Sequence, residues 1–256
     1  MNVIIDTHSH IYDEQYVADE AEMLARAAAA GVHKIYMPNC DSSTIAPMMR
    51  LAHAYPTLCK PMMGLHPCYV KTNYKEELQL VADQLSAHNF YGVGEIGLDY
   101  YWDLSFKEEQ IEALHYQIGL AKTYRLPIIL HSRESTADCI AIVKQHQDGM
   151  LKGIFHCFSG SIAEAKAVVD LGFYLGIGGV VTYKKSNLPE IIQAVGMAHL
   201  VLETDAPYLS PIPYRGKRNE SAYLPIIGAK VAEIAGISLE EMAQISTNNA
   251  ENIFGK

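Results

Sequence analysis

Histidine and carboxylate side chains recur directly after short apolar stretches of this chain. His8 and His10 follow the first stretch, and similar residues end or follow four later ones. The full set is His8, His10, Glu95, His131, His156 and Asp205. Neutral imidazoles together with carboxylates suit Zn²⁺, Mn²⁺ or a similar divalent ion, and Mg²⁺ is a less natural occupant of a histidine-rich site. The pattern therefore predicts a metal site assembled from distant parts of the chain.

This set offers more ligands than one ion needs. A tetrahedral zinc takes four ligands, and here four histidines accompany two carboxylates. Two divalent ions that share a carboxylate would use the surplus. A pair spaced about 3.5–4 Å apart would also hold both the attacking and the leaving oxygen of a phosphoryl transfer. We therefore expect two ions as cofactors, with Zn, Mn and Mg as the candidates.

Each of these residues also has an ordinary structural explanation. A single His-x-His pair is a weak indication of metal binding, Glu95 or Asp205 could cap the segment that follows it, and His131 or His156 could be a hydrogen-bonded core histidine. The recurrence of ligand-type residues at five strand ends favours the metal site. The remaining histidines, apart from His66, are expected on helices or near the amino ends of strands: His33, His53, His88, His115, His146 and His199.

An alternation of short apolar runs and amphipathic stretches must position these side chains. The runs are rich in Val, Ile, Leu, Met or Tyr, as in strands buried on both faces, and cover residues 3–6, 34–38, 60–65, 92–96, 127–131, 153–156, 173–177 and 200–204. Helices are predicted near 17–30, 43–54, 75–88, 107–124, 134–147, 162–170, 187–196, 223–235 and 239–251. Eight strands, each followed by a helix, predict an α/β fold of the (β/α)8 TIM barrel type with an extra C-terminal helix.

An open, doubly wound sheet is the competing architecture. Such a sheet usually has fewer strands and often a glycine-rich phosphate loop after the first one. Here the first strand ends in DTHSH at 6–10, and GIGG at 176–179 comes too late in the chain to be that loop. The barrel is favoured, and it brings the carboxyl ends of all strands to one mouth, where active sites of this fold lie.

Composition narrows the class of protein. The chain has 256 residues, 49% of them apolar, so a single domain over 1–256 can bury one large core. The start MNVIIDTHSH lacks a signal-peptide pattern, no apolar run reaches the ~18 residues of a membrane span, and five cysteines lack a disulfide-like spacing. We expect a cytoplasmic protein that does not bind membranes and acts as a monomer. The net charge of −9 argues against a protein that coats DNA by bulk electrostatics, but not against an enzyme that binds a phosphate with metal ions.

Several longer motifs resemble those of the TatD family of deoxyribonucleases, within the wider amidohydrolase-like superfamily. They are DTHSH at 6–10, GEIGLDY at 94–100, LHSR at 130–133, HCFSG at 156–160, ETDAPYL at 203–209 and YRGKRNE at 214–220. The match runs from the first strand to the helix after the eighth. One departure is NESAY at 219–223, where the family more often has a proline after the glutamate.

The resemblance implies a hydrolase acting on ester bonds, a metal-dependent deoxyribonuclease that cuts phosphodiester bonds as an exonuclease. One ion would be held by His8, His10 and Asp205 and the other by His131 and His156, with Glu95 bridging them. A metal-activated hydroxide would attack phosphorus. Asp205 would accept the proton of the attacking water, so Asp205 and Glu95 are the predicted catalytic residues.

Substrate contacts are expected on the same face. The predicted partner is DNA, as single strands or 3′ ends. The candidate contacts are His66, Arg133, Arg215, Lys217 and Arg218, by charge stabilisation or phosphate binding. Charged runs are often only solvated loops. Tyr100, Tyr101 and Trp102 follow the fourth strand, where they could stack on bases or pack within their loop.

Two other functions stay open at this point. The same barrel and metal pair could hydrolyse an ester, a lactone or the acyl bond of an aminoacyl-tRNA, since fold does not decide chemistry. The basic loop favours a phosphate-bearing substrate. A non-catalytic metal-binding or nucleic-acid-binding protein is disfavoured because every predicted ligand is present.

Overall fold

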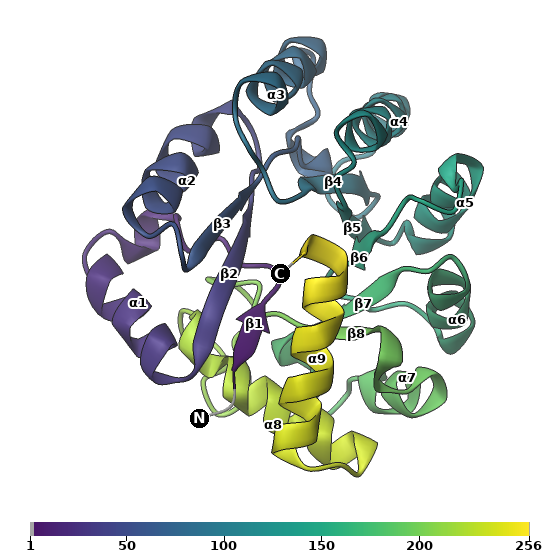
Figure 1. Cartoon of the computed structure of the whole chain (residues 1–256). Coiled ribbons are helices and arrows are strands. Elements are labelled where there is room, and N and C mark those ends of the chain that lie inside the picture. Colours follow the sequence, from purple (N-terminus) through teal and green to yellow (C-terminus); the bar gives the residue numbers. More distant parts are fainter. Residues whose placement is uncertain (1–2, 256) are drawn as a thin grey trace.

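A computed structural model describes residues 3–255 as eight parallel strands alternating with helices. The strands are β1 (Ile4–Asp6), β2 (Val32–Pro38), β3 (Cys59–Met62), β4 (Val93–Asp99), β5 (Ile128–Arg133), β6 (Gly153–Phe155), β7 (Tyr174–Ile177) and β8 (Leu200–Leu202). The α-helices are α1 (Glu20–Ala29), α2 (Ser42–Ala54), α3 (Tyr74–Ala87), α4 (Lys107–Tyr124), α5 (Thr136–His146), α6 (Ile162–Asp170), α7 (Leu188–Val195), α8 (Leu224–Ala235) and α9 (Leu239–Phe254). The predicted barrel with an extra C-terminal helix is confirmed, and the helices surround the strands in Figure 1.

Backbone hydrogen bonds join the strands in sequence order. β1, β2 and β3 form one parallel sheet, and β4 to β8 form another. Between the two sheets, Met63 N donates to Gly92 O and Gly94 N donates to Met63 O, at 3.1 and 3.0 Å. On the other side Thr7 N donates to Leu202 O at 3.0 Å. These bonds connect the sheet edges and close the ring.

The interior of the ring is a small apolar core of its own. One residue from each of six strands points into it, and the set is Ile5, Tyr36, Met62, Ile129, Ile154 and Val201. Ala250 and Ile253 of α9 pack on this set, and Phe254 stacks on Tyr36 with 3.7 Å between ring centroids. Figure 1 shows α9 crossing the near end of the ring. The C-terminal helix therefore plugs one end of the barrel.

The plugged end is the amino end of the strands. Thr247 Oγ1 donates to Val3 O at 2.9 Å, and Asn249 Nδ2 donates to the carbonyl of Leu200, the first residue of β8, at 2.8 Å. Ser238 caps α9 by accepting a hydrogen bond from Glu241 N at 3.1 Å. The carboxyl ends of the strands are left at the opposite end, where this fold places its sites.

Most strand boundaries agree with the prediction, and one difference affects the site. β4 continues to Asp99, three residues beyond the predicted end. Glu95 therefore lies within the strand rather than at its end. The extension follows from backbone pairing of Gly97 with His131 and of Asp99 with Arg133 on β5.

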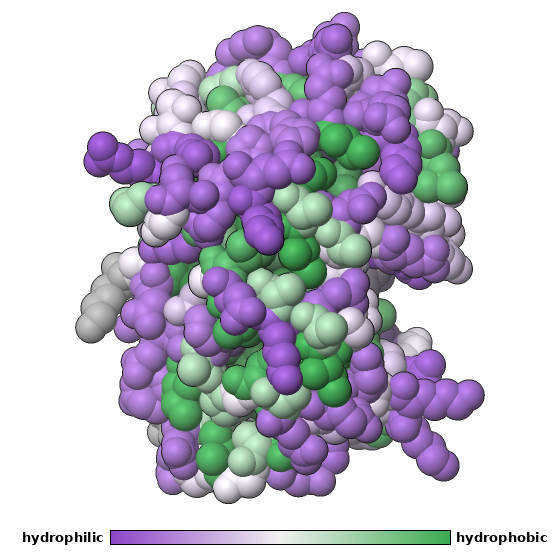
Figure 2. Space-filling view, turned by 90° about the vertical axis from the view of Figure 1, so that its right-hand side faces the viewer, coloured by the Kyte–Doolittle hydropathy of each residue, from purple (hydrophilic) through white to green (hydrophobic). Residues whose placement is uncertain are grey.

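The surface and the helices give no simple membrane pattern. On the face shown in Figure 2, apolar side chains (green) are interspersed with polar ones (purple). Among residues 3–255, no single helix is long and apolar enough to span a membrane. The two helical segments Ser221–Ala235 and Leu239–Phe254, joined by a bend, together have the length and composition of a membrane span. The buried core helices of other proteins share these properties.

Candidate metal centre

Strand periodicity carries two of the predicted ligands to one place. Side chains two residues apart in a strand point to the same face. Ile129 and Ile154 fill the barrel interior, so His131 and His156, two positions later, point along the same interior towards the mouth. The apolar core of the barrel and the polar residues of the site are therefore successive inward-facing positions of the same strands.

A buried carboxylate positions the segment after β1. Asp6 accepts hydrogen bonds from Thr204 N, Thr204 Oγ1 and Ser221 Oγ at 2.9, 2.6 and 2.7 Å. Asp205 N in turn donates to the carbonyl of His8 at 2.9 Å. These bonds tie the His8–His10 segment to the loop after β8 and bring Asp205 beside both histidines.

Four side chains form the first half of the centre. His8 Nε2 lies 3.2 Å from His10 Nε2, 3.1 Å from Glu95 Oε2 and 3.6 Å from Asp205 Oδ1. His10 Nε2 lies 3.4 Å from Glu95 Oε2 and 3.7 Å from Asp205 Oδ1. Ligands about 2.1 Å from a tetrahedral ion lie roughly 3.4 Å apart. The donor atoms thus have the chemistry and the spacing of a divalent-ion site.

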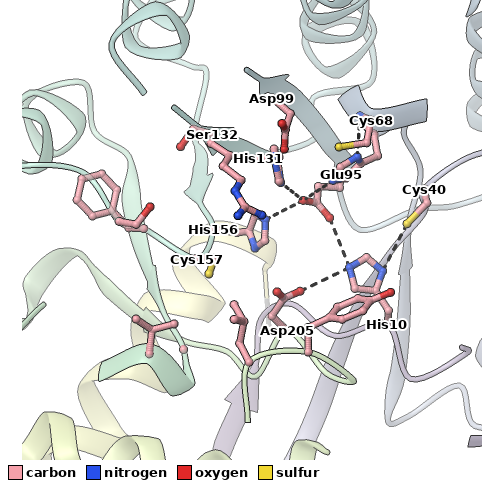
Figure 3. A pocket seen from close by; sticks show the side chains of 18 of the residues that line it. His10, Cys40, Cys68, Glu95, Asp99, His131, Ser132, His156, Cys157 and Asp205 are labelled. Carbon is pink, nitrogen blue, oxygen red and sulfur yellow. Dashed lines mark hydrogen bonds and ion pairs between the residues drawn. The ribbon is translucent and has the colours of Figure 1, made fainter. Parts of the chain in front are cut away.

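The second half gathers around the other oxygen of the same carboxylate. Glu95 Oε1 lies 2.7 Å from His156 Nε2, 2.9 Å from His131 Nδ1 and 3.3 Å from His66 Nε2. Figure 3 shows the Glu95 carboxylate between His10 on one side and His131 and His156 on the other. Glu95 thus offers one oxygen to each half.

Hydrogen bonds to the outer ring nitrogens indicate which histidines direct a lone pair inward. A neutral imidazole has one donor and one acceptor nitrogen. His131 Nε2 lies 2.8 Å from Asp99 Oδ2, which can only accept when ionised, so the proton is outside and Nδ1 faces Glu95. His10 Nδ1 lies 2.8 Å from Tyr12 Oη, which itself donates to a carbonyl, so His10 is held in the same way.

His66 has the opposite arrangement. Its Nδ1 accepts a hydrogen bond from Cys68 N at 3.0 Å, which places the proton of the neutral ring on Nε2. The nitrogen that faces Glu95 is therefore a donor. His66 is suited to donating a hydrogen bond to an oxygen at the centre, and less suited to binding an ion.

Charge and burial set the protonation of the carboxylates. Burial opposes ionisation of Glu95, but His156, His66 and His8 outweigh it and hold the pKa of its carboxyl well below its usual range. Burial raises the pKa of Asp205 to about 6, although His156 and His10 oppose that shift. The two carboxylates differ in character, and the Asp205 carboxyl gains and loses a proton much closer to neutral pH than Glu95 does.

Two carboxylates that the sequence reading assigned no role support the histidines from outside. Asp99, inside the motif at 94–100, holds His131. Glu203, inside the motif at 203–209, is fully buried, accepts a hydrogen bond from Cys157 N at 2.5 Å and lies 3.7 Å from His156 Nδ1. An outer partner such as Asp99 fixes the orientation of a ligating histidine, whereas Glu203 places a negative charge near His156 without a hydrogen bond to it. Only their place inside conspicuous motifs could have identified them from sequence.

The centre forms the floor of a cavity of about 630 Å³. His66 and Arg133 line it, as the sequence predicted for the mouth, whereas Arg215, Lys217 and Arg218 do not. Arg218 instead pairs with Asp19 through two contacts of 2.7 Å, and any phosphate would compete with that pair. Arg215 lies over the ring of Tyr183, 4.6 Å from its centroid.

The other histidines lie away from the centre, as expected. His53 and His146 are on helices and His33 is near the amino end of β2, for example. His115 and His146 contact each other, with 2.7 Å between Nδ1 and Nε2, on the outer helices α4 and α5. Neither ring lines the cavity.

Comparison with known proteins agrees with this geometry. The family described as "TatD related DNase" matches residues 5–255. The metal-dependent hydrolase YabD of Bacillus subtilis, itself called uncharacterized, is 39% identical, with 98% of this chain and 99% of that protein covered. The "3'-5' ssDNA/RNA exonuclease TatD" of Klebsiella pneumoniae is 30% identical over 98% of both chains.

A solved structure shares the fold closely. The TatD homologue YJJV of Escherichia coli K12 superposes with a TM-score of 0.90 at 35% identity, covering 99% of this chain and 98% of the other. The family match spans nearly all of the sequence, and several relatives at 30% identity or more are named metal-dependent hydrolases. This chain therefore belongs to the TatD-related DNase family of metal-dependent hydrolases.

Proposed function

We propose that this protein is a metal-dependent deoxyribonuclease that hydrolyses phosphodiester bonds at the 3′ ends of single-stranded DNA. The observation that carries the proposal is the Glu95 carboxylate, whose two oxygens serve two separate sets of ligands at the floor of an open cavity. A site for two ions suits phosphoryl transfer in particular. The names of the exonuclease relatives support the choice of substrate and the direction of attack.

His8, His10 and Asp205 would hold one ion, His131 and His156 the other, and Glu95 both. Bound divalent ions lower the pKa of water and offset negative charge on phosphoryl oxygens. The chain supplies the rest. Asp205, beside His8 and His10, is placed to accept the proton of the attacking water. His66 directs an N–H into the centre, where it can donate to a phosphoryl oxygen.

Arg133 is the proposed phosphate contact within the cavity. Its guanidinium makes no ion pair with a carboxylate within residues 3–255, unlike those of Arg26, Arg50 and Arg218. An unpaired guanidinium beside a metal centre is suited to bind a phosphate through paired N–H groups. Exposed Arg215 and Lys217 on the loop after β8 would act further along the strand.

The wider setting of the protein is also proposed. The family match at 5–255 supports one domain over 1–256. All five cysteines are free, which supports a reducing, cytoplasmic environment. That the protein acts as a monomer remains a prediction.

Release of nucleotides from DNA tests the proposed activity. Metal-depleted protein is mixed with 5′-labelled single-stranded DNA, and Mn²⁺, Mg²⁺ or Zn²⁺ is then added. We expect cutting only with a divalent ion, fragments that shorten from the 3′ end, and no cutting by Glu95→Ala, which guards against a contaminating nuclease. A folded, metal-loaded wild type that leaves DNA intact would contradict the proposal and favour an ester or acyl substrate.

A further inference from the structure

Several aromatic side chains are exposed around the metal cavity, among them Tyr69, Tyr208 and two sequence neighbours after β4. Tyr101 and Trp102 follow β4, and their side chains remain 51% and 67% exposed. Trp102 also lines the cavity, together with Asp99, His131 and Arg133. Large aromatic side chains are usually buried when their only role is packing. Exposure beside a metal centre therefore calls for a ligand that would cover the ring.

The rim is fixed to the metal centre by one carboxylate. Asp99 Oδ1 accepts hydrogen bonds from Tyr101 N and Trp102 N, both at 3.0 Å. Its other oxygen, Oδ2, lies 2.8 Å from His131 Nε2. The same side chain thus orients a predicted ligand and holds the turn that carries the aromatic pair, so the backbone of Trp102 is kept at a fixed place beside the metal centre.

Arg133 joins this arrangement from the neighbouring strand. Its guanidinium carbon lies 3.9 Å from the centroid of the Tyr101 ring and 5.3 Å from that of Trp102. Tyr101 and Trp102 meet edge to face, at 4.9 Å and 86°. One face of Tyr101 is therefore covered by Arg133, while the indole of Trp102 is still largely free.

An aromatic ring and an unpaired cation side by side complement the two parts of a nucleotide, its base and its phosphate. Every nucleotide has a base with a flat face that can stack on an aromatic ring, and a phosphate on its sugar that a cation can bind. A carboxylate-rich partner would be attracted by Arg133 but would not use the indole, and an apolar partner would leave the guanidinium unused. The cavity that Trp102 and Arg133 share leads directly to Glu95.

We propose that Trp102 stacks on the base of the nucleotide being cleaved, while Arg133, held by Tyr101, contacts a phosphate next to that base. This inference rests on the proposed nuclease function and names the part of the substrate that the rim recognises. Stacking tolerates any base, so the site would select for an unpaired, splayed base and not for a sequence. A paired base inside a duplex could not reach the indole.

Binding can be followed directly because Trp102 is the chain's single tryptophan. The metal-loaded protein is titrated with a phosphorothioate-linked tetrathymidylate, which resists hydrolysis, and with an abasic tetramer of the same backbone. We expect the thymidylate to quench tryptophan fluorescence and the abasic tetramer to leave it nearly unchanged. Equal responses to the two, or none to either, would overturn the proposal.

Kinetics separates stacking from the chemistry of the centre. Trp102→Ala should lower kcat/KM for single-stranded DNA by about 10- to 100-fold, the range expected for loss of one stacked base. Trp102→Phe should recover most of that loss, and both variants should match the wild type on DNA whose cleaved nucleotide is abasic. Tyr116→Ala, which removes an exposed aromatic ring from α4, is the matched control and should have no effect.

The outcomes distinguish this inference from the proposed function. An equal loss for Trp102→Ala on normal and abasic DNA, or no loss on normal DNA, would rule out the stack while leaving the nuclease intact. A wild type that cuts neither DNA would refute the nuclease. In that case quenching by thymidylate alone would still support a base site at Trp102.

Discussion

At the scale of single residues, the centre depends on where protons sit. Asp99 and Tyr12 each accept a hydrogen bond from the outer N–H of a histidine, so the unprotonated inner nitrogen faces Glu95. His66 has the reverse arrangement because a backbone N–H occupies its outer nitrogen. Three rings that look alike in the sequence therefore differ in what they can do, and hydrogen bonds outside the centre decide the difference.

The Asp99–His131 contact gives the first prediction. In Asp99→Asn the new amide can donate to His131 Nε2, which would favour a proton on the nitrogen that faces Glu95. Affinity for the ion that His131 would bind should fall about 10- to 100-fold, the usual cost of losing such an outer partner. Titration with Mn²⁺ measures this, with Glu76→Gln on exposed α3 as control. Equal affinities for wild type and Asp99→Asn would show that the contact does not position His131.

Proton release on metal binding is the second prediction. Burial opposes a charged His156, but Glu95 and Glu203 outweigh it and hold the pKa of His156 well above its usual value. The metal-free ring is therefore protonated at neutral pH, and an ion must displace that proton. Apparent metal affinity should rise with pH between about 6 and 8. Calorimetry in buffers of different ionisation enthalpy should detect released protons, and a pH-independent affinity would contradict this assignment.

At the scale of elements, a network of ion pairs holds the loop after β8 against α1. Asp19, just before α1, binds both Arg26 and Arg218, and Arg26 also binds Glu220. The loop that ends in this network begins with Asp205 at the metal centre. Of the three basic residues in this loop, Arg218 is therefore paired with Asp19, whereas Arg215 and Lys217 are exposed and could contact a phosphate.

This network gives a pH-dependent stability prediction. Hydrogen bonds from Arg218 and Arg26 hold the pKa of Asp19 well below its usual value. A depressed pKa adds stability that is present above the unfolded pKa of about 3.9 and is lost as pH falls below it. Asp19→Asn should cost at most about 1 kcal/mol at pH 7, because the pair is partly exposed.

The difference between Asp19→Asn and wild type should shrink as pH falls towards 3. Chemical denaturation at pH 7 and at low pH measures it, with Glu22→Gln on the same helix as control. A destabilisation of Asp19→Asn that stays constant over this pH range would show that charge is not the source.

The strands and the positions of the ligands could be predicted because both follow from local patterns in the sequence. Each strand was recognisable as an apolar run, and ligands adjoin such runs because strand periodicity sends them to the mouth. The partner of Arg218 was not predictable, since Asp19 lies far away in the sequence and is adjacent only through the fold. The length of β4 was likewise set by pairing with β5, and the roles of Asp99 and Glu203 by contacts that no spacing reveals.

At the scale of the whole molecule, the helix that closes the barrel and the cavity with the metal centre lie at opposite ends of the barrel. Helix α9 fills the amino end, and the cavity opens at the carboxyl end. Ile253 is 1% exposed within the plug. Ile253→Ala should lower the free energy of unfolding by about 2–5 kcal/mol through the lost contacts and the cavity left behind.

Metal affinity at 25 °C should be unaffected in Ile253→Ala while the fold holds. Thermal unfolding and metal titration together test this, and Leu239→Ala, an exposed position on the same helix, is the control. Loss of metal affinity in a folded Ile253→Ala would show that the plug and the centre are coupled.

The count of bound ions tests the central claim most directly. Wild type, His131→Ala, His10→Ala and Glu95→Ala are saturated with Mn²⁺, freed of excess ion and analysed for metal per chain, with folding checked by circular dichroism. If Glu95 serves two ions, wild type should hold two, each histidine variant about one, and Glu95→Ala none. A wild type that saturates at one ion, or a folded Glu95→Ala that keeps two, would contradict the shared carboxylate.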